Sequence, residues 1–128
     1  MKVHYILALI ALLFAGAAYA QQDYPRDITL TWTNADSYTD GTPILAGDLE
    51  SVRVECFRNQ DTVPTVSRTV PDTGEGAAQT ETFTGAIPSP GVYTCVAYSI
   101  VVGGAESDAS GEASRKYTGK PLPPQNFN

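Results

Sequence analysis

Apolar and polar residues alternate in short runs along most of the chain. In the run ITLTW, the side chains of Ile28, Leu30 and Trp32 share one face, and two threonines occupy the other. A period of two is typical of strands with one buried face, whereas an amphipathic helix needs a period near 3.6. The pattern therefore predicts strands over residues 28–32, 52–57, 62–70, 79–84, 92–101 and 112–118.

Turn-forming residues separate these runs. The longest connection, residues 34–47, and the polar turn over 71–76 are rich in Asp, Gly and Pro. Gly103 and Gly104 follow the longest run and can supply the positive φ of a hairpin tip. Pro64 places its own run at a sheet edge, because proline cannot donate to a ladder. Several short strands divided by such turns predict an all-β sandwich or barrel.

The first twenty residues have the pattern of a secretory signal peptide. Lys2 supplies a positive charge, an apolar run follows, and Ala18 and Ala20 form an A-x-A cleavage signal. The alternative is an uncleaved anchor, since the apolar stretch nearly spans a bilayer, but an anchor has no need of A-x-A. We therefore expect cleavage between Ala20 and Gln21, and a secreted or periplasmic protein.

The chain after cleavage has the size of one domain. It comprises a folded unit over residues 21–118 and a proline-rich tail over 119–128. Loss of Lys2 leaves seven Lys and Arg against fourteen Asp and Glu, a formal charge of −7. Such a surface repels phosphate backbones and anionic lipid, so nucleic acid and membrane insertion are not expected as partners.

Residues for catalysis are scarce. The only histidine, His4, lies in the expected signal peptide, so the remaining chain can form no Ser-His-Asp triad and no imidazole metal site. No glycine-rich phosphate loop precedes a helical segment. These observations predict a protein that is not an enzyme and uses no cofactor.

Carboxylates gather around the first long loop. Asp36, Asp40, Asp48 and Glu50 offer oxygens of the kind that Ca²⁺ binds. Their spacing matches no twelve-residue calcium loop, and aspartate is also a common turn former. The sequence favours the turn interpretation and predicts no metal site.

The order of several short motifs resembles the fibronectin type III domain over residues 25–118. Trp32 ends an early strand, VRV follows at 52–54, and Ile87 precedes Tyr93 by six positions across the corner IPSPGVY. TCVAYSIVV, a glycine turn and a serine-rich last strand that includes residues 106–110 continue the order of that family. The resemblance implies a two-sheet antiparallel β-sandwich of about seven strands, with Trp32, Val54, Ile87 and Tyr93 in its core.

Two cysteines in an exported chain predict one disulfide, Cys56 with Cys95. The resemblance places these residues on the third and sixth strands, neighbours in one sheet with inward side chains. An immunoglobulin domain is the rival assignment, because its hallmark tyrosine also lies two residues before a cysteine, as Tyr93 does here. That family has the order Cys, Trp, Cys, and Trp32 precedes both cysteines here.

The resemblance implies adhesion, display or binding of a protein or glycan at a cell or virion surface, in a bacterial or bacteriophage setting. We expect contact through the long first loop, with Tyr38 and Asp40, and through the hairpin with Gly103 and Gly104. Tyr38 and Tyr98 are also candidates for stacking on a sugar. A structural subunit that joins an assembly through a sheet edge or its tail is the alternative function.

Overall fold

The computed structural model describes residues 12–13, 26–119 and 121–126. The described part of the chain contains strands and irregular connections, with no helix. The predicted cleavage residues Ala18 and Ala20, and also His4, lie outside the described residues. The strands are β1 (Leu12–Leu13), β2 (Arg26–Thr33), β3 (Leu49–Arg58), β4 (Val66–Pro71), β5 (Ala78–Ile87), β6 (Gly91–Val101) and β7 (Ala113–Tyr117).

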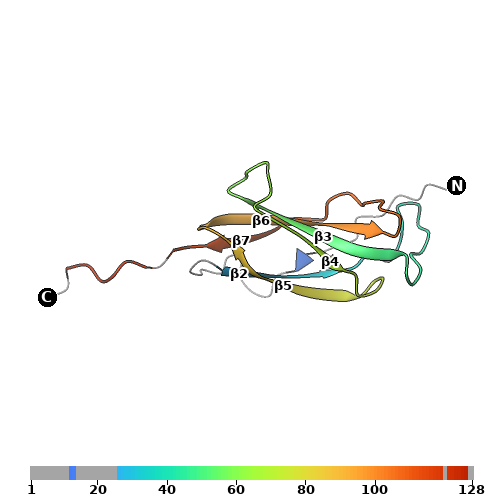
Figure 1. Ribbon diagram of the computed structural model, residues 1–128, viewed down its shortest axis with the longest axis horizontal. Coiled ribbons are helices and arrows are strands. Elements are labelled where there is room, and N and C mark those ends of the chain that lie inside the picture. Colours follow the sequence, from blue (N-terminus) through green and yellow to red (C-terminus); the bar gives the residue numbers. More distant parts are fainter. Residues whose placement is uncertain (1–11, 14–25, 120, 127–128) are drawn as a thin grey trace.

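The strands form two antiparallel sheets that lie face to face (Figure 1). One sheet has the order β1-β2-β5, and the other has the order β4-β3-β6-β7. All ladders are antiparallel. The prediction of an all-β protein with two antiparallel sheets is therefore confirmed, and the alternating runs of the sequence supply its strands.

The inner faces of both sheets build one core. Alternation along β2 turns Ile28, Leu30 and Trp32 inward, where each is at most 1% exposed. Val54 on β3 faces them from the other sheet, and Ile87 at the end of β5 points inward from their own sheet; both are fully buried. At about 25 cal/mol per Å² of apolar surface, burial of such side chains is the main stabilising contribution to the sandwich.

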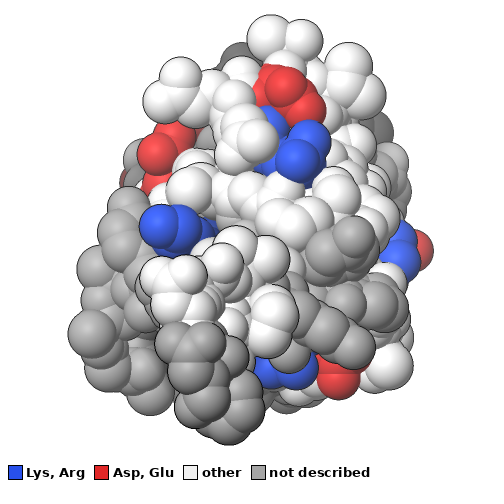
Figure 2. Space-filling view, turned by 90° about the vertical axis from the view of Figure 1, so that its left-hand side faces the viewer, with Lys and Arg blue, Asp and Glu red and all other residues white. Residues whose placement is uncertain are grey.

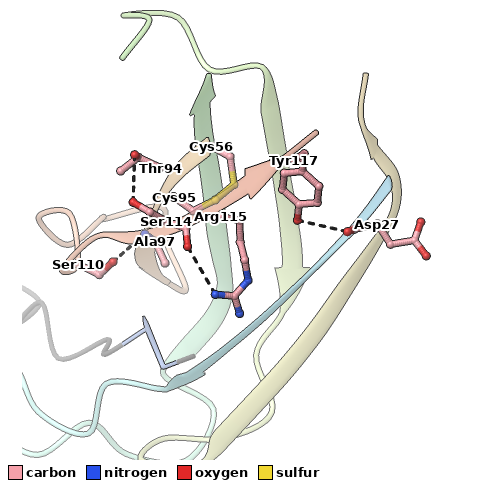
Figure 3. The surroundings of a disulfide bond; sticks show 9 residues. All are labelled: Asp27, Cys56, Thr94, Cys95, Ala97, Ser110, Ser114, Arg115 and Tyr117. Atoms are coloured by element: carbon pink, nitrogen blue, oxygen red, sulfur yellow. Dashed lines mark hydrogen bonds between the residues drawn. A yellow bond between two sulfur atoms is a disulfide. The ribbon is translucent and has the colours of Figure 1, made fainter. Parts of the chain in front are cut away.

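The predicted disulfide between Cys56 and Cys95 is present inside this core (Figure 3). The two cysteines are direct partners in the β3–β6 ladder, and neither is exposed. The bond closes a loop with a sequence separation of 39. In the chain-entropy model, a crosslink over a loop of that length stabilises the folded state by about 4 kcal/mol.

Tyr93 fixes the turn that leads into β6. Its ring is buried and meets the ring of Tyr117 edge to face, with 5.6 Å between ring centroids. Its hydroxyl donates to the carbonyl oxygen of Ser89 at 2.7 Å. The Tyr117 hydroxyl donates to the carbonyl of Asp27 at 3.3 Å, which joins the end of β7 to the start of β2 (Figure 3).

The serine-rich segment 106–110, expected as part of the last strand, does not form one. Ser107 and Ser110 are buried, and their hydroxyl oxygens accept the main-chain N–H groups of Ser99 and Ala97 at 2.9 Å. Side-chain oxygens thus replace ladder carbonyls, a known competition of serine with regular structure. The regular strand β7 begins only at Ala113.

Two further expectations need adjustment. The run expected over 62–70 is a strand only from Val66, because residues 59–65 form a turn before it, although β4 does lie at a sheet edge. Strand β1, in contrast, lies inside the expected signal peptide, where no strand was predicted. No helix in the described ranges is long and apolar enough to cross a membrane.

Candidate functional site

Two connections meet at one end of the sandwich, the right-hand end of Figure 1. They are residues 34–48, between β2 and β3, and residues 102–106, after β6; we call them together the loop surface. The main-chain N–H of Val102 donates to the carbonyl oxygen of Asp48 at 2.9 Å. A bridge between Ile100 and Glu106 closes the second connection. The two loops expected to carry contacts therefore form one continuous surface.

The longer loop has a small core of its own. Ala35, Ile44 and Leu49 are buried together, and the half-buried side chains of Tyr38 and Val101 pack against them. A bridge between residues 37 and 43 closes the loop as a short hairpin. Because its interior is packed and its main chain is paired, this loop presents a fixed shape to the solvent.

Aspartates of the longer loop stabilise its turns. Asp40 is exposed, and its carboxylate accepts the N–H of Thr42 at 2.9 Å. Asp48 accepts the N–H of Leu45 at 3.0 Å and the hydroxyl of Tyr38 at 3.4 Å. Burial, followed by the charge of Asp48, raises the pKa of Tyr38 above its ordinary value. Tyr38, expected as a contact residue, is half-buried: it packs against the core of the loop and keeps part of its surface exposed.

The calcium interpretation gains no support from this geometry. Among the residues that the structure describes, no three His, Cys, Asp or Glu side chains come together as metal ligands. Asp36 accepts the hydroxyl of Ser37 at 3.1 Å, while Asp40 and Asp48 serve the turns described above. Each of these contacts is one that a turn-forming aspartate makes.

Asn34, which the sequence analysis did not single out, anchors the longer loop to the core. It is 1% exposed, and its Oδ1 accepts the indole N–H of Trp32 at 2.8 Å. Its Nδ2 donates to the carbonyl of Gly74 at 3.0 Å and to Oε1 of Gln79 at 3.1 Å. One side chain therefore joins β2, β5 and the turn between β4 and β5. The available signal was a polar residue two positions after an inward tryptophan, at the next position of the same parity.

Two large apolar side chains are exposed on the loop surface, among polar residues. Leu45 and Val102 are each 66% exposed, although large aliphatic side chains usually pack inward. Both flank Asp48, since the N–H of Leu45 donates to its carboxylate and the N–H of Val102 donates to its carbonyl. Gly103 and Gly104 follow with φ of 101° and 92°, a conformation that favours glycine, and both are exposed.

Tyr98, considered for sugar stacking, is covered. The guanidinium of Arg53 lies over its ring, with 4.6 Å between Cζ and the ring centroid. Arg53 also forms ion pairs with Glu55, at 3.0 Å, and with Glu106. Its hydrogen bond to Glu106, followed by smaller contributions, raises the pKa of Arg53. The ring face is therefore occupied by a paired cation and is not free for a sugar.

A shallow groove lies on the outer face of the four-stranded sheet, at the opposite end of β3. Two adjoining hollows of about 410 and 430 Å³ share Gln60 and Thr94 in their walls. Asn59 and Gln60 adopt positive φ, 49° and 66°, and Asn59 Oδ1 accepts the N–H of Val92 at 3.0 Å. The remaining lining residues are Phe57, Asp61, Glu112 and Ser114.

Charges are distributed without a patch of one sign over the end from which the tail leaves. Figure 2 shows that end, where the described acidic and basic side chains lie scattered between neutral residues. The excess of acidic over basic residues in the sequence is thus not concentrated on this side. A strong local field, of the kind that guides polyanions or polycations, is absent from the described residues in this view.

Comparisons with known proteins give no family. No family model matches the chain, and no curated protein matches it. Among solved structures, one described as "Myokine structure" is similar, with a TM-score of 0.46, 7% identity and coverage of 91% of this chain and 100% of that one. A superoxide reductase (neelaredoxin) from Ignicoccus hospitalis has a TM-score of 0.41, 9% identity and coverage of 90% and 82%. Similarities this low support no functional transfer.

Proposed function

We propose that the chain is an exported, non-enzymatic binding module of the fibronectin type III-like class that contacts a protein partner through the loop surface. The observation that carries this proposal is the pair of exposed aliphatic residues, Leu45 and Val102, whose main-chain N–H groups both bond to Asp48 where the two loops meet. Exposed apolar groups on a fixed support are the usual contact elements of protein interfaces.

Rigidity of the support favours binding. Asn34, the small loop core and the disulfide between Cys56 and Cys95 fix the loops before any partner arrives. Binding of a partner then costs less free energy for the ordering of the loops, because that ordering has already occurred on folding.

The chemistry around the two aliphatic side chains indicates what the partner presents. Asp40 and Glu106 lie on the same two loops, and the chain as a whole is acidic. An apolar depression with basic residues at its rim is complementary to such a surface. Cell and virion surfaces are the setting that the expected export implies.

The class assignment draws on the sheet order and on two local features. The order β1-β2-β5 and β4-β3-β6-β7, a disulfide between β3 and β6, and the Tyr93 hydroxyl on the carbonyl of Ser89 support a fibronectin type III-like sandwich. The non-enzymatic assignment rests on the lack of histidine after residue 4 and on carboxylates engaged in turns.

Paired charge substitutions test the proposal. Leu45→Asp with Val102→Asp places two like charges on the loop surface without touching the core, and should reduce binding to the surface fraction of the source organism at least about tenfold. Val63→Asp is the matched control, because Val63 is 72% exposed on the turn between β3 and β4. Equal binding by both variants would refute a contact at the loop surface.

The groove at Gln60 and Thr94 favours a second candidate function, glycan binding. Across its two adjoining hollows, an aromatic ring, two amides and two carboxylates supply the stacking and hydrogen-bonding groups that sugars need. Titration with oligosaccharides checks this candidate. If the groove binds glycans, the Gln60→Ala variant should lose sugar binding, and the Leu45→Asp variant should retain it.

A further inference from the structure

The outer edge of β2 is paired with a segment that export is expected to remove. Leu12 pairs with Trp32 and Leu13 with Thr31, so β1 covers this edge of the three-stranded sheet (Figure 1). We propose that in the processed chain a second copy takes this place, with the two β2 strands pairing antiparallel about a twofold axis at Thr31. The inference rests on signal-peptide removal, and it does not depend on the loop surface.

The main-chain groups that become available are those of alternate threonines. The N–H of Asn34 donates to the carbonyl of Ala77 in the connection that precedes β5, so even-numbered residues of β2 direct their main-chain groups toward β5. The main-chain N–H and C=O groups of Thr29, Thr31 and Thr33 therefore face the opposite edge. An unpaired row of this kind is a template for another strand.

The residue pattern of β2 is self-complementary about Thr31. In an antiparallel pair centred there, Thr31 faces Thr31 of the second copy and Thr29 faces Thr33, all on the outer side. Leu30 then faces Trp32 of the second copy on the inner side, where both residues already point. Every pair joins like with like, so the twofold arrangement is isologous and closes as a dimer.

The existing ladder on the outer face would continue across the axis. Thr29 and Thr82 join through their hydroxyls at 2.8 Å, and Thr31 and Thr80 do the same at 2.9 Å. Cross-strand threonine pairs stabilise antiparallel sheets, and the second copy extends both rows by further threonines.

The other sheet edges carry features that discourage pairing, whereas the charged residues of β2, Arg26 and Asp27, lie at its start, outside the part that would pair. Charged side chains, a terminal proline or an irregular register blunt an edge strand. Residues 28–33 of β2 contain no charge, glycine or proline. In contrast, β4 has Arg68 and ends at Pro71, β7 has Arg115 and Lys116, and β5 has Glu81 and a register shift where the Gly85 N–H donates to Asp27 at 2.7 Å.

The two stretches that flank the sandwich in the sequence, residues 21–25 and 119–128, are poorly suited to the vacant place. Only residues 21–25 would precede Arg26, and a segment that reverses and reaches the level of Trp32 needs more residues than that. The tail contains Pro121, Pro123 and Pro124, which lack the N–H donors of a ladder strand. A second β2 satisfies every threonine donor and acceptor on the edge.

Sedimentation velocity of the exported protein, with its N-terminus determined by mass spectrometry, tests the inference. The processed chain should dimerise, and Thr31→Lys should raise the dissociation constant at least about tenfold, because two like charges then face each other at the axis. Thr80→Lys is the matched control: it adds the same charge to the same face and removes the same Thr31–Thr80 hydrogen bond, one strand farther from the axis. It should change the dissociation constant less than about threefold.

A charge-exchange experiment defines the register. Thr31→Lys mixed with Thr31→Glu should restore a dimer that contains one copy of each, because opposite charges then meet at the axis. The inference is overturned by an exported chain that retains residues 12–13, by a processed chain that stays monomeric at every concentration, or by equal effects of Thr31→Lys and Thr80→Lys. If the β2 edge instead pairs with a strand of a different protein, the purified processed chain stays monomeric, and that result also overturns the inference.

Discussion

Substitution of Asn34 tests how the loop surface is held on the sandwich. The side chain is 1% exposed, accepts the Trp32 indole N–H at 2.8 Å, and donates to Gly74 and Gln79. Asn34→Ala removes all of these bonds and leaves the indole N–H buried without an acceptor. Asn34→Asp retains the acceptor for the indole N–H. Its second carboxylate oxygen, however, points at the carbonyl of Gly74 and at Oε1 of Gln79, which are themselves acceptors.

The magnitude follows from the desolvation of the groups left behind. One buried donor without a partner costs about 1–3 kcal/mol. Oε1 of Gln79 still accepts the hydroxyl of Thr73 at 3.3 Å, so the loss of its hydrogen bond from Asn34 is partly compensated. We expect Asn34→Ala to lower the free energy of unfolding by about 3 kcal/mol. We expect Asn34→Asp to lower it further, because a buried charge then lies against the carbonyl of Gly74, Oε1 of Gln79 and the carboxylate of Asp72, which the Nδ2 group now satisfies.

Urea unfolding followed by far-ultraviolet circular dichroism measures both values and does not depend on the single tryptophan. Trp32→Phe is the partner substitution, since phenylalanine has no N–H to satisfy. In that background, Asn34→Ala should cost about 1–2 kcal/mol less than in the natural chain, which measures the coupling of the two residues. Losses below about 1 kcal/mol for both Asn34 variants, with no coupling, would refute the anchoring role.

Three further predictions concern the sandwich itself. Replacing Cys56 and Cys95 together by alanine should lower the unfolding free energy by about 4 kcal/mol in denaturant titrations, and an unchanged midpoint would contradict the stabilising role of the disulfide. Tyr93→Phe should cost about 1 kcal/mol through the lost bond to Ser89, measured by thermal unfolding; Tyr98→Phe, on the outer face, is the control and should change little. Burial raises the pKa of Tyr117, so the folded state holds its proton more tightly and stability should fall as the pH rises past about 10. Tyr117→Phe should flatten that alkaline decline, and an identical decline in both proteins would contradict the direction of the shift.

The periodic parts of the fold were predictable from the sequence because local pattern and burial agree there. Ile28, Leu30 and Trp32 alternate with threonines, and the same residues are the buried ones in β2. Cys56 and Cys95 lie on inward positions of two alternating runs, so their pairing needed only the correct strand neighbours. Where one face is apolar, the register is strongly specified.

The parts that escaped prediction depend on contacts between distant residues. Asn34 is one polar residue in a polar loop, and its role follows only from the approach of Gly74 and Gln79. Ser107 and Ser110 belong to a strand-like run, yet their hydroxyls take over main-chain pairing. Leu45 and Val102 belong to one surface because two loops far apart in sequence meet at Asp48, which no local pattern reveals.

Photo-crosslinking on the intact source organism tests the loop surface most directly. A photoreactive residue at position 102 or 45 of the exported chain should yield a discrete adduct with one partner protein, while the same residue at position 63, equally open to solvent, should yield none. Adducts from position 63 alone, or the same diffuse products from all three positions, would contradict the account.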